Sequence, residues 1–170
     1  MWRALHPPLL RYLRVRGDGA EDLASETWMQ VLRGLDGFVG DARDFRAWLF
    51  TIARNRAIDA GRARTRRPTV PVADVTELHP DPRRQAAPSA EDVAMDNDDT
   101  ARALRLVATL PVAQAEMVML RVVAGLDVAD VAEILDKKPG TVRVTVHRAL
   151  QTLARDQRAA SPSESSREVV

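Results

Sequence analysis

The chain has 170 residues, of which 45% are hydrophobic, 29% are charged and only 4% are aromatic. This composition predicts one ordinary globular domain or two small ones with an aliphatic core. The chain has no cysteine, which excludes a disulfide scaffold, a thiol nucleophile and a cysteine zinc site. No apolar run reaches the ~20 residues that cross a bilayer, and the amino end lacks a signal-peptide pattern. We therefore expect a cytoplasmic protein without membrane insertion.

Charge is segregated along the chain, although the net charge is only +1. Residues 1–67 carry a net +5, residues 68–100 carry −6, residues 101–160 carry +3 and residues 161–170 carry −1. Two basic parts therefore flank an acidic one. This asymmetry is typical of modules that bind a polyanion and are joined by a segment with a different task.

In the amino-terminal part, apolar residues recur at helical spacing, and no segment alternates as a strand does. The pattern predicts helices over residues 3–16, 20–35 and 44–66, with a break at Gly17-Asp18-Gly19 and a loop over residues 36–43. On the second helix we expect a buried side made of Leu23, Thr27, Val31, Leu32 and Leu35. On the third we expect burial of Phe45, Trp48, Leu49 and Ile52, after which the helix becomes rich in arginine.

The middle of the chain, residues 68–100, contains five prolines and no sustained periodicity, which predicts an extended acidic linker. The last ten residues, SPSESSREVV, have the polar composition of a disordered tail. The predicted fold class is therefore all-α. Two small helical domains, residues 1–67 and 101–160, are joined by the linker, and residues 161–170 follow as the tail.

The second domain carries the pattern of a helix-turn-helix. Leu110-Pro111 opens a helix that Gly125 ends, and Asp127 can cap a short helix from Val128 to Leu135. After a turn at residues 136–138, a helix from Pro139 to about Ala154 follows. On this last helix one face is apolar, with Val142, Val146, Ala149, Leu150 and Leu153. The other face presents Val144, His147, Arg148 and Gln151, with Arg143 on its flank.

A plain helical hairpin with solvated charges is the alternative interpretation of this pattern. Lys137, Lys138, Arg143 and Arg148, however, stand where the phosphates of a bound duplex would lie. Val144 stands at the centre of the exposed face, where a merely solvated helix would favour a polar side chain. Both observations favour a helix that reads DNA.

The end of the third predicted helix carries a net +5 over residues 54–67. The same helix presents Asn55, whose amide can pair with a base edge, and it follows a glycine-containing loop with Phe38. These residues fit a pocket for an unpaired base with arginines along the phosphates. They fit equally well a solvated basic helix end beside the core residues Trp28 and Trp48.

Catalytic and metal sites find little support in the sequence. The three histidines are far apart, and there is no phosphate-binding or dinucleotide-binding glycine motif. The aspartates of the 36–43 loop and its end, Asp36, Asp41 and Asp44, have the ligand chemistry for Mg²⁺ and phosphodiester cleavage, but a solvated loop explains them. We expect no catalytic residue, no metal and no cofactor.

Three segments resemble the bacterial sigma factors of RNA polymerase, specifically the small two-domain extracytoplasmic-function (ECF) class. AEDLASETW at residues 20–28 resembles the polymerase-binding signature of that family. FRAWLFTIARNRAID at 45–59 resembles its promoter-melting helix, and LP at 110–111 through VRVTVHRAL at 143–150 resembles its second-domain helix-turn-helix. The order and spacing of the three segments agree with the family.

The resemblance implies a sigma factor that directs core RNA polymerase to promoters. Residues 1–67 would be sigma region 2, which binds the clamp helices and opens the minus-ten element, and residues 101–160 would be region 4, which reads the minus-thirty-five element and touches the flap. It implies polymerase contacts by Asp22, Ser25, Glu26 and Thr27. It implies minus-ten contacts, including a pocket for a flipped base, by Phe38, Val39, Gly40, Asp41, Arg43, Trp48, Asn55, Arg56 and Arg62. It implies minus-thirty-five contacts by Lys137, Lys138, Thr141, Arg143, Val144, His147, Arg148 and Gln151.

The resemblance further implies that the acidic linker lies along the RNA path, and that an anti-sigma factor is a partner. The chain departs from the family pattern at Ser25, Asp136, Val144 and Thr145, so the promoter sequence is not implied. Two other classes of function remain open. A stand-alone helix-turn-helix regulator leaves AEDLASETW and the first domain unexplained, and a nuclease needs the loop aspartates and a divalent metal.

Overall fold

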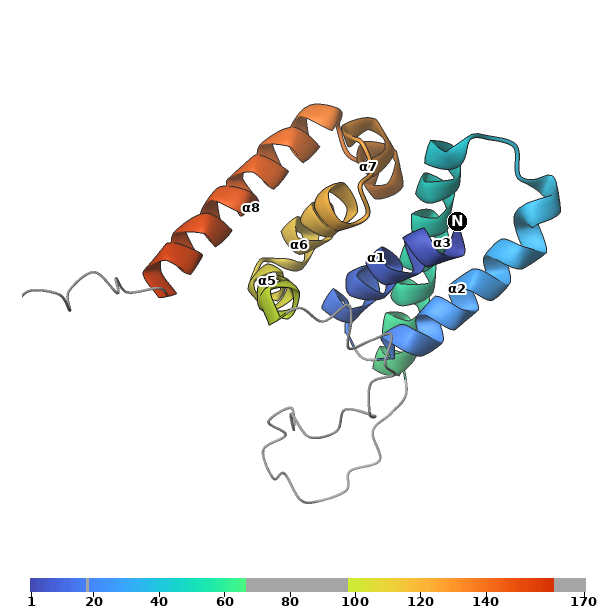
Figure 1. Cartoon of the computed structure of the whole chain (residues 1–170), viewed down its shortest axis with the longest axis horizontal. Helices are drawn as coiled ribbons and strands as arrows, with labels where there is room; N and C mark the ends of the chain where they lie inside the picture. The colour runs from blue at the N-terminus through green and yellow to red at the C-terminus, as the bar shows by residue number, and fades with distance from the viewer. Residues whose placement is uncertain (18, 67–97, 161–170) are drawn as a thin grey trace, which may run out of the picture.

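A computed structural model describes residues 1–17, 19–66 and 98–160, and within these ranges it contains helices and turns but no strand (Figure 1). This confirms the all-α prediction. The elements in chain order are α1 (Trp2–Val15), α2 (Ala20–Gly34), the 3₁₀ turn η1 (Leu35–Gly37), α3 (Ala42–Arg66), α5 (Asp98–Ala108), α6 (Val112–Val118), the π-helical turn η2 (Met119–Val123), α7 (Val128–Leu135) and α8 (Pro139–Ala160). None of the described helices is long and apolar enough to cross a membrane.

The first domain is built from α1, α2 and α3, which pack against one another. Its core includes Leu9, Tyr12 and Leu13 of α1 with Leu49 and Phe50 of α3, all of them fully buried. The Tyr12 and Phe50 rings meet edge to face, with 5.6 Å between their centroids. The break between α1 and α2 lies at the predicted glycines, because Gly19 adopts a left-handed conformation (φ 80°) that side chains with a Cβ adopt only at a cost.

The buried side of α2 differs from the prediction. Leu32 and Leu35, which we expected in the core, have 67% and 46% of their surface exposed. The buried residues are Ala20, Leu23, Ala24, Thr27 and Val31. At 100° per residue, Leu32 lies more than a quarter turn from the centre of that stripe, and α1 and α3 do not reach it. On α3, Phe45 and Leu49 are buried as predicted, whereas Trp48 and Ile52 are half-buried.

The second domain begins earlier than expected. Helix α5 starts at Asp98, so residues 98–100, which we assigned to the linker, are helical. The remainder of the predicted linker and the predicted tail lie outside the described residues. Helix α6 does not run unbroken to Gly125 as predicted, because after Val118 the chain widens into the π-helical turn η2.

The helix-turn-helix is formed by α7 and α8. The Asp127 carboxylate accepts a hydrogen bond from the Asp130 N–H at 2.9 Å, which is the predicted cap of α7. In the turn, Asp136 adopts a left-handed conformation (φ 50°, ψ 55°) that aspartate tolerates better than most residues. Helix α8 extends to Ala160, beyond the predicted end at Ala154. The two domains lie side by side: α1 contacts α5 and η2, and α3 contacts α7 (Figure 1).

Candidate nucleic-acid interface

Helix α8 separates into a buried and an exposed face. Val142, Val146 and Ala149 are buried against the rest of the second domain. All the residues predicted to meet a duplex are exposed, namely Lys137, Lys138, Thr141, Arg143, Val144, His147, Arg148 and Gln151. Leu150, which we expected on the buried face, is 41% exposed, because it lies at the edge of the contact with the other helices.

The exposed face of α8 combines one apolar side chain with cationic and amide groups. Val144 has 49% of its surface exposed although it stands among polar neighbours. The side-chain nitrogens of Gln151 and His147 lie 3.0 Å apart, so these two groups orient each other one helical turn apart. A helix with this face can offer methyl contact, amide and imidazole hydrogen bonds and cationic groups to the major groove.

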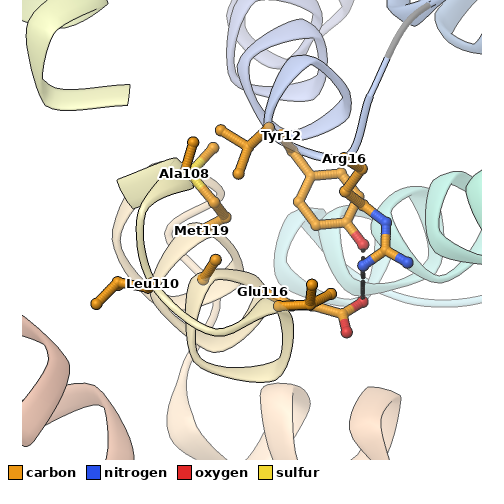
Figure 2. A pocket seen from close by; sticks show the side chains of 9 residues that line it. Tyr12, Arg16, Ala108, Leu110, Glu116 and Met119 are labelled. Atoms are coloured by element: carbon orange, nitrogen blue, oxygen red, sulfur yellow. Dashed lines mark hydrogen bonds and ion pairs between the residues drawn. The ribbon is translucent and has the colours of Figure 1, made fainter. Parts of the chain in front are cut away.

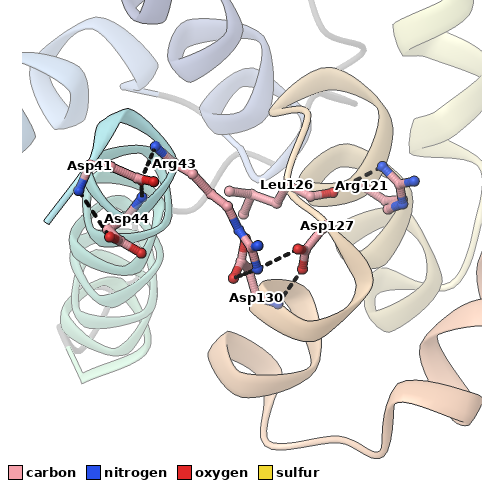
Figure 3. A network of polar contacts seen from close by, with 7 residues as sticks. All are labelled: Asp41, Arg43, Asp44, Arg121, Leu126, Asp127 and Asp130. Carbon is pink, nitrogen blue, oxygen red and sulfur yellow. Dashed lines mark hydrogen bonds and ion pairs between the residues drawn. The ribbon is translucent and has the colours of Figure 1, made fainter.

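The loop before α3 ends in a reciprocal cap. The Asp41 Oδ1 accepts from the N–H groups of Arg43 and Asp44 at 2.7 and 3.0 Å, and the Asp44 Oδ2 accepts from the Asp41 N–H at 2.9 Å (Figure 3). Hydrogen bonds from the backbone of Asp44 and Arg43 lower the pKa of Asp41. Because of this cap, α3 begins at Ala42 and not at Asp44 as predicted. Asp41 thus fixes the start of the helix, and its carboxylate is already engaged.

Three aromatic rings support the same loop. The Phe38 ring stacks on Trp48 with 5.0 Å between centroids and meets Phe45 edge to face at 5.4 Å. Phe38 and Trp48 are therefore half-buried supports of the loop and not free stacking platforms. Next to them, Val39 is 94% exposed, so it forms the protruding tip together with the exposed Gly40.

The polar groups along α3 have different environments. Asn55 is exposed, and its side chain has no hydrogen-bond partner within the described part of the chain. Arg56 donates to the Gln30 side chain, and Arg62 lies 3.8 Å from Asp59. The side chains of Arg64 and Arg66 lie outside the described residues. Asn55 is therefore the group of this predicted set that is most available to a new partner.

On α2, the predicted polymerase-binding residues Asp22, Ser25 and Glu26 are exposed. Thr27 is not: it is fully buried, and its hydroxyl donates to the Leu23 carbonyl at 2.6 Å. Thr27 therefore lies on the buried side of α2, as its helical position predicts, and not on the exposed face that carries the other polymerase contacts implied by the resemblance. Conversely, Met29 and Leu32 are 52% and 67% exposed on this helix. Apolar residues at helical spacing predict a core, so no pattern in the sequence indicates that these two are exposed.

Residues 1–67 match the family description Sigma-70 region 2, and residues 100–153 match Sigma-70, region 4. The ECF RNA polymerase sigma factor ShbA of Streptomyces griseus is 37% identical over 157 residues, covering 88% of this chain and 81% of ShbA. The chain belongs to the ECF class of RNA polymerase sigma factors. ECF sigma factor BldN of Streptomyces coelicolor is 38% identical over 148 residues, covering 85% of this chain and 53% of BldN, so the chain spans about half of BldN.

Two solved structures share the fold of this sigma factor. The sigma factor RpoE of Bartonella quintana, in complex with the anti-sigma factor NepR, has a TM-score of 0.63 at 24% identity over 92% of this chain and 94% of that chain. CnrH, in complex with the cytosolic domain of CnrY, has a TM-score of 0.60 at 21% identity over 94% of this chain and 84% of that chain. As an ECF sigma factor, the protein directs RNA polymerase to promoters and acts in transcription initiation.

One predicted minus-ten residue of this sigma factor is held by the second domain. The Arg43 guanidinium donates two hydrogen bonds to the Asp130 carboxylate, at 3.1 and 2.9 Å, and pairs with Asp127 (Figure 3). The Asp130 and Asp127 carboxylates raise the pKa of Arg43. The pKa of Asp127 is lowered, first by the hydrogen bond from the Asp130 N–H and further by Arg43. No sequence pattern indicates this contact, because it joins positions 87 residues apart.

A second polar contact between the domains centres on Glu116 of α6. Its Oε1 lies 2.6 Å from Arg16 Nη1 and accepts from the Tyr12 hydroxyl at 3.2 Å (Figure 2). The same oxygen lies 3.0 Å from Arg54 Nε. Only 11% of the Glu116 side chain is exposed. Burial raises the pKa of Tyr12 far above its ordinary value, which keeps the hydroxyl protonated as the donor. The acid of α6 thus binds three groups of the first domain.

Proposed function

We propose that the two domains of this ECF sigma factor read a promoter in two different ways. Helix α8 reads the minus-thirty-five duplex, and the loop over residues 36–43 with Asn55 holds an unpaired base of the minus-ten element. The observation that carries this proposal is the clean division of α8, whose buried residues leave every predicted contact exposed. The protein contributes binding and positioning, and the polymerase carries out the chemistry.

For the duplex, we assign base contacts to Val144, His147 and Arg148. Val144 meets the methyl group of a thymine, because an apolar side chain finds no other favourable contact at the base edges. Lys137, Lys138 and Arg143, which lie toward the amino-terminal part of α8, hold phosphates and fix the register of the helix on the duplex.

For the melted region, the structure supports a division between supporting and contacting residues. Phe38, Trp48 and the Asp41 cap hold the loop, while Val39, Gly40 and Asn55 are exposed and face a base. Arg56 and Arg62 lie along the same helix and are placed to contact the phosphates of the single strand. A base that leaves the stack loses pairing and stacking, which the loop and Asn55 offset.

For the polymerase, we assign the exposed face of α2 to the clamp helices. Asp22, Ser25 and Glu26 supply polar contacts, and Met29 and Leu32 supply apolar area. Exposed carboxylates chiefly steer association, whereas exposed apolar side chains gain most when they are buried at the centre of an interface. The double substitution Met29→Ser with Leu32→Ser is therefore expected to weaken polymerase binding more than Asp22→Ala with Glu26→Ala. Glu133→Ala, which removes an exposed acid from α7, serves as the control.

For the flap, we assign the apolar groove between α5, η2 and α8. Its lining includes Leu104, Val107, Val122, Leu150 and Leu153, and its volume is about 600 Å³. The exposure of Leu150 and Val122, at 41% and 55%, follows from this groove. An anti-sigma factor that covers the groove would compete with the flap, which is the inhibition we propose for such a partner.

Run-off transcription tests the whole proposal. Core RNA polymerase from the same organism is combined with the purified protein and a genomic promoter library, and transcript starts are mapped. We expect starts that depend on the protein and share upstream motifs. If the protein binds promoter duplex alone but never associates with the polymerase, the stand-alone regulator is the better assignment.

A further inference from the structure

The two domains of this sigma factor are joined by contacts that use a residue of its proposed DNA-binding loop. We propose that these contacts form an intrachain latch, in which Asp127 and Asp130 occupy Arg43 as a DNA phosphate would and Glu116 secures the first domain against the second. The inference rests on the proposed function, in which the loop over residues 36–43 meets the minus-ten strand, and it adds that Arg43 of this loop contacts a phosphate. It does not rest on that function for the existence of the latch.

The first part of the latch is the fork on Arg43. Asp130 receives two parallel hydrogen bonds from the guanidinium, and Asp127 adds a second carboxylate (Figure 3). A guanidinium binds carboxylate and phosphate with the same bidentate geometry. Asp127 is also the cap of α7, so the anionic site sits on the helix that supports the recognition helix. Arg43 can therefore hold either the second domain or a DNA phosphate, but not both.

The second part is the Glu116 cluster. It joins one residue of α6 to Tyr12 and Arg16 of the α1 segment (Figure 2) and also to Arg54 of α3. The Glu116 cluster is more enclosed than the Arg43 fork: the acids Glu116 and Asp130 are similarly covered, but the side chains of Arg16 and Arg54 are 17% and 26% exposed against 57% for Arg43. Screening by water is weaker there, so Glu116 contributes the larger share of the contact. Arg46 adds a hydrogen bond to the Ala124 carbonyl at 3.1 Å.

Simultaneous binding to both promoter elements requires the two domains to separate. Elements centred at minus ten and minus thirty-five lie about 25 base pairs apart, which is ~85 Å along a duplex at ~3.4 Å per base pair. In the structure, Arg43 at the minus-ten loop and Asp130 beside the recognition helix are 2.9 Å apart. One molecule cannot occupy both elements while the latch is closed. The exposed face of α8, in contrast, remains free in the closed form.

The absence of cysteine from the chain makes the latch directly measurable. Cysteines replace Arg33 on α2 and Asp156 on α8, both exposed, and carry spin labels for a distance measurement on the full chain. We compare the parent with Glu116→Gln, Asp130→Asn and the two combined. The control is Glu133→Gln, which changes an exposed carboxylate of α7 that has no side-chain partner within the described residues.

We expect the parent and the Glu133→Gln control to give one narrow distance distribution, because a closed latch fixes α2 relative to α8. Glu116→Gln should shift the ratio of open to closed molecules by about tenfold, Asp130→Asn by about threefold, and the combination by more than either. The parent should also become open in a complex with polymerase and promoter. Circular dichroism confirms that the helical content is retained, and Tyr12→Phe, which keeps the packing, is the milder variant. Unchanged distances in Glu116→Gln combined with Asp130→Asn would overturn the latch.

A second measurement separates the latch from the proposed function. Binding of a fluorescent single strand carrying the minus-ten sequence is measured for the free chain and each variant. A gain in affinity that follows the open fraction supports the proposal. If the distances change but the affinity does not rise, the domains are held by these contacts while Arg43 is no DNA ligand, which overturns the phosphate-like role of Asp127 and Asp130 and the proposed role of Arg43 together.

Discussion

The most specific prediction concerns the contact of Val144 with a thymine methyl group. Replacing valine by alanine removes two carbon groups, each worth about 0.8 kcal/mol when fully buried. The side chain is already half covered in the free protein, since 49% of its surface is exposed. Covering the remaining half against DNA therefore stabilises the complex by about 0.8 kcal/mol, which is about a fourfold change in affinity.

The same contact can be removed from the DNA, because deoxyuridine differs from thymidine only by this methyl group. Polymerase holoenzyme carrying the parent or the Val144→Ala variant is bound to a minus-thirty-five duplex with thymidine or deoxyuridine at each thymine in turn. At one position we expect about a fourfold loss from deoxyuridine with the parent and no further loss with Val144→Ala. Val112→Ala, an exposed valine of α6 at 77%, is the control that should leave the methyl effect unchanged.

The refuting result is equally definite. If deoxyuridine weakens binding by the same factor in the parent and in Val144→Ala at every position, the side chain does not touch a methyl group. The register of α8 in the groove would then differ from the one that we propose. A loss from Val144→Ala that is the same on all duplexes would instead indicate a role in the packing of the second domain.

Three further predictions follow from the same geometry. Asn55→Ala should leave binding to the upstream duplex unchanged but reduce permanganate reactivity of the melted region, since a bidentate base contact is worth ~1–3 kcal/mol; normal reactivity would contradict the assignment. Lys138→Ala should weaken all duplexes alike and lower the salt slope of log K by about 0.9, whereas Arg148→Ala should relax base preference in a selection on randomised DNA; equal effects would contradict the division into phosphate and base contacts. Phe50→Ala should lower the free energy of unfolding by ~3–5 kcal/mol in urea, because the ring is fully buried, whereas Val39→Ala at the loop tip should change it little.

The latch gives the segregated charge of the chain a local meaning. The acids of the second domain that face the first, Glu116, Asp127 and Asp130, pair with arginines of the basic first domain. The basic groups that we assign to DNA, Lys137, Lys138, Arg143 and Arg148, lie in the turn before α8 and on the exposed face of that helix, away from this contact. The second domain therefore has two faces of opposite charge: an acidic face that contacts the first domain and a basic face that is free for DNA.

The helices of this protein, their caps and the exposed face of α8 could be predicted from local sequence. Helical periodicity predicted the helices, and the glycines predicted the break between α1 and α2. Asp127 was predictable as the cap of α7. All these features depend on neighbours within a few residues. The exposed set on α8 was equally predictable, since Val142 and Val146 fix the buried face and a rigid helix then places every other side chain. The three segments that resemble sigma factors are also local in sequence.

What depends on contacts between distant segments was decided only by the tertiary structure. Periodicity marks an apolar residue but not whether another helix covers it, so Leu32, Leu35 and Leu150 were expected in the core and are exposed. For Thr27 the helical pattern predicts burial and the resemblance implies a polymerase contact; it is buried, because α1 and α3 close over that side of α2. The partners of Arg43 and Glu116 lie many helical turns away in sequence, and a charged side chain looks the same in a sequence whether it faces water or a partner. Only the packing of one domain on the other determines whether such a side chain faces water or a partner.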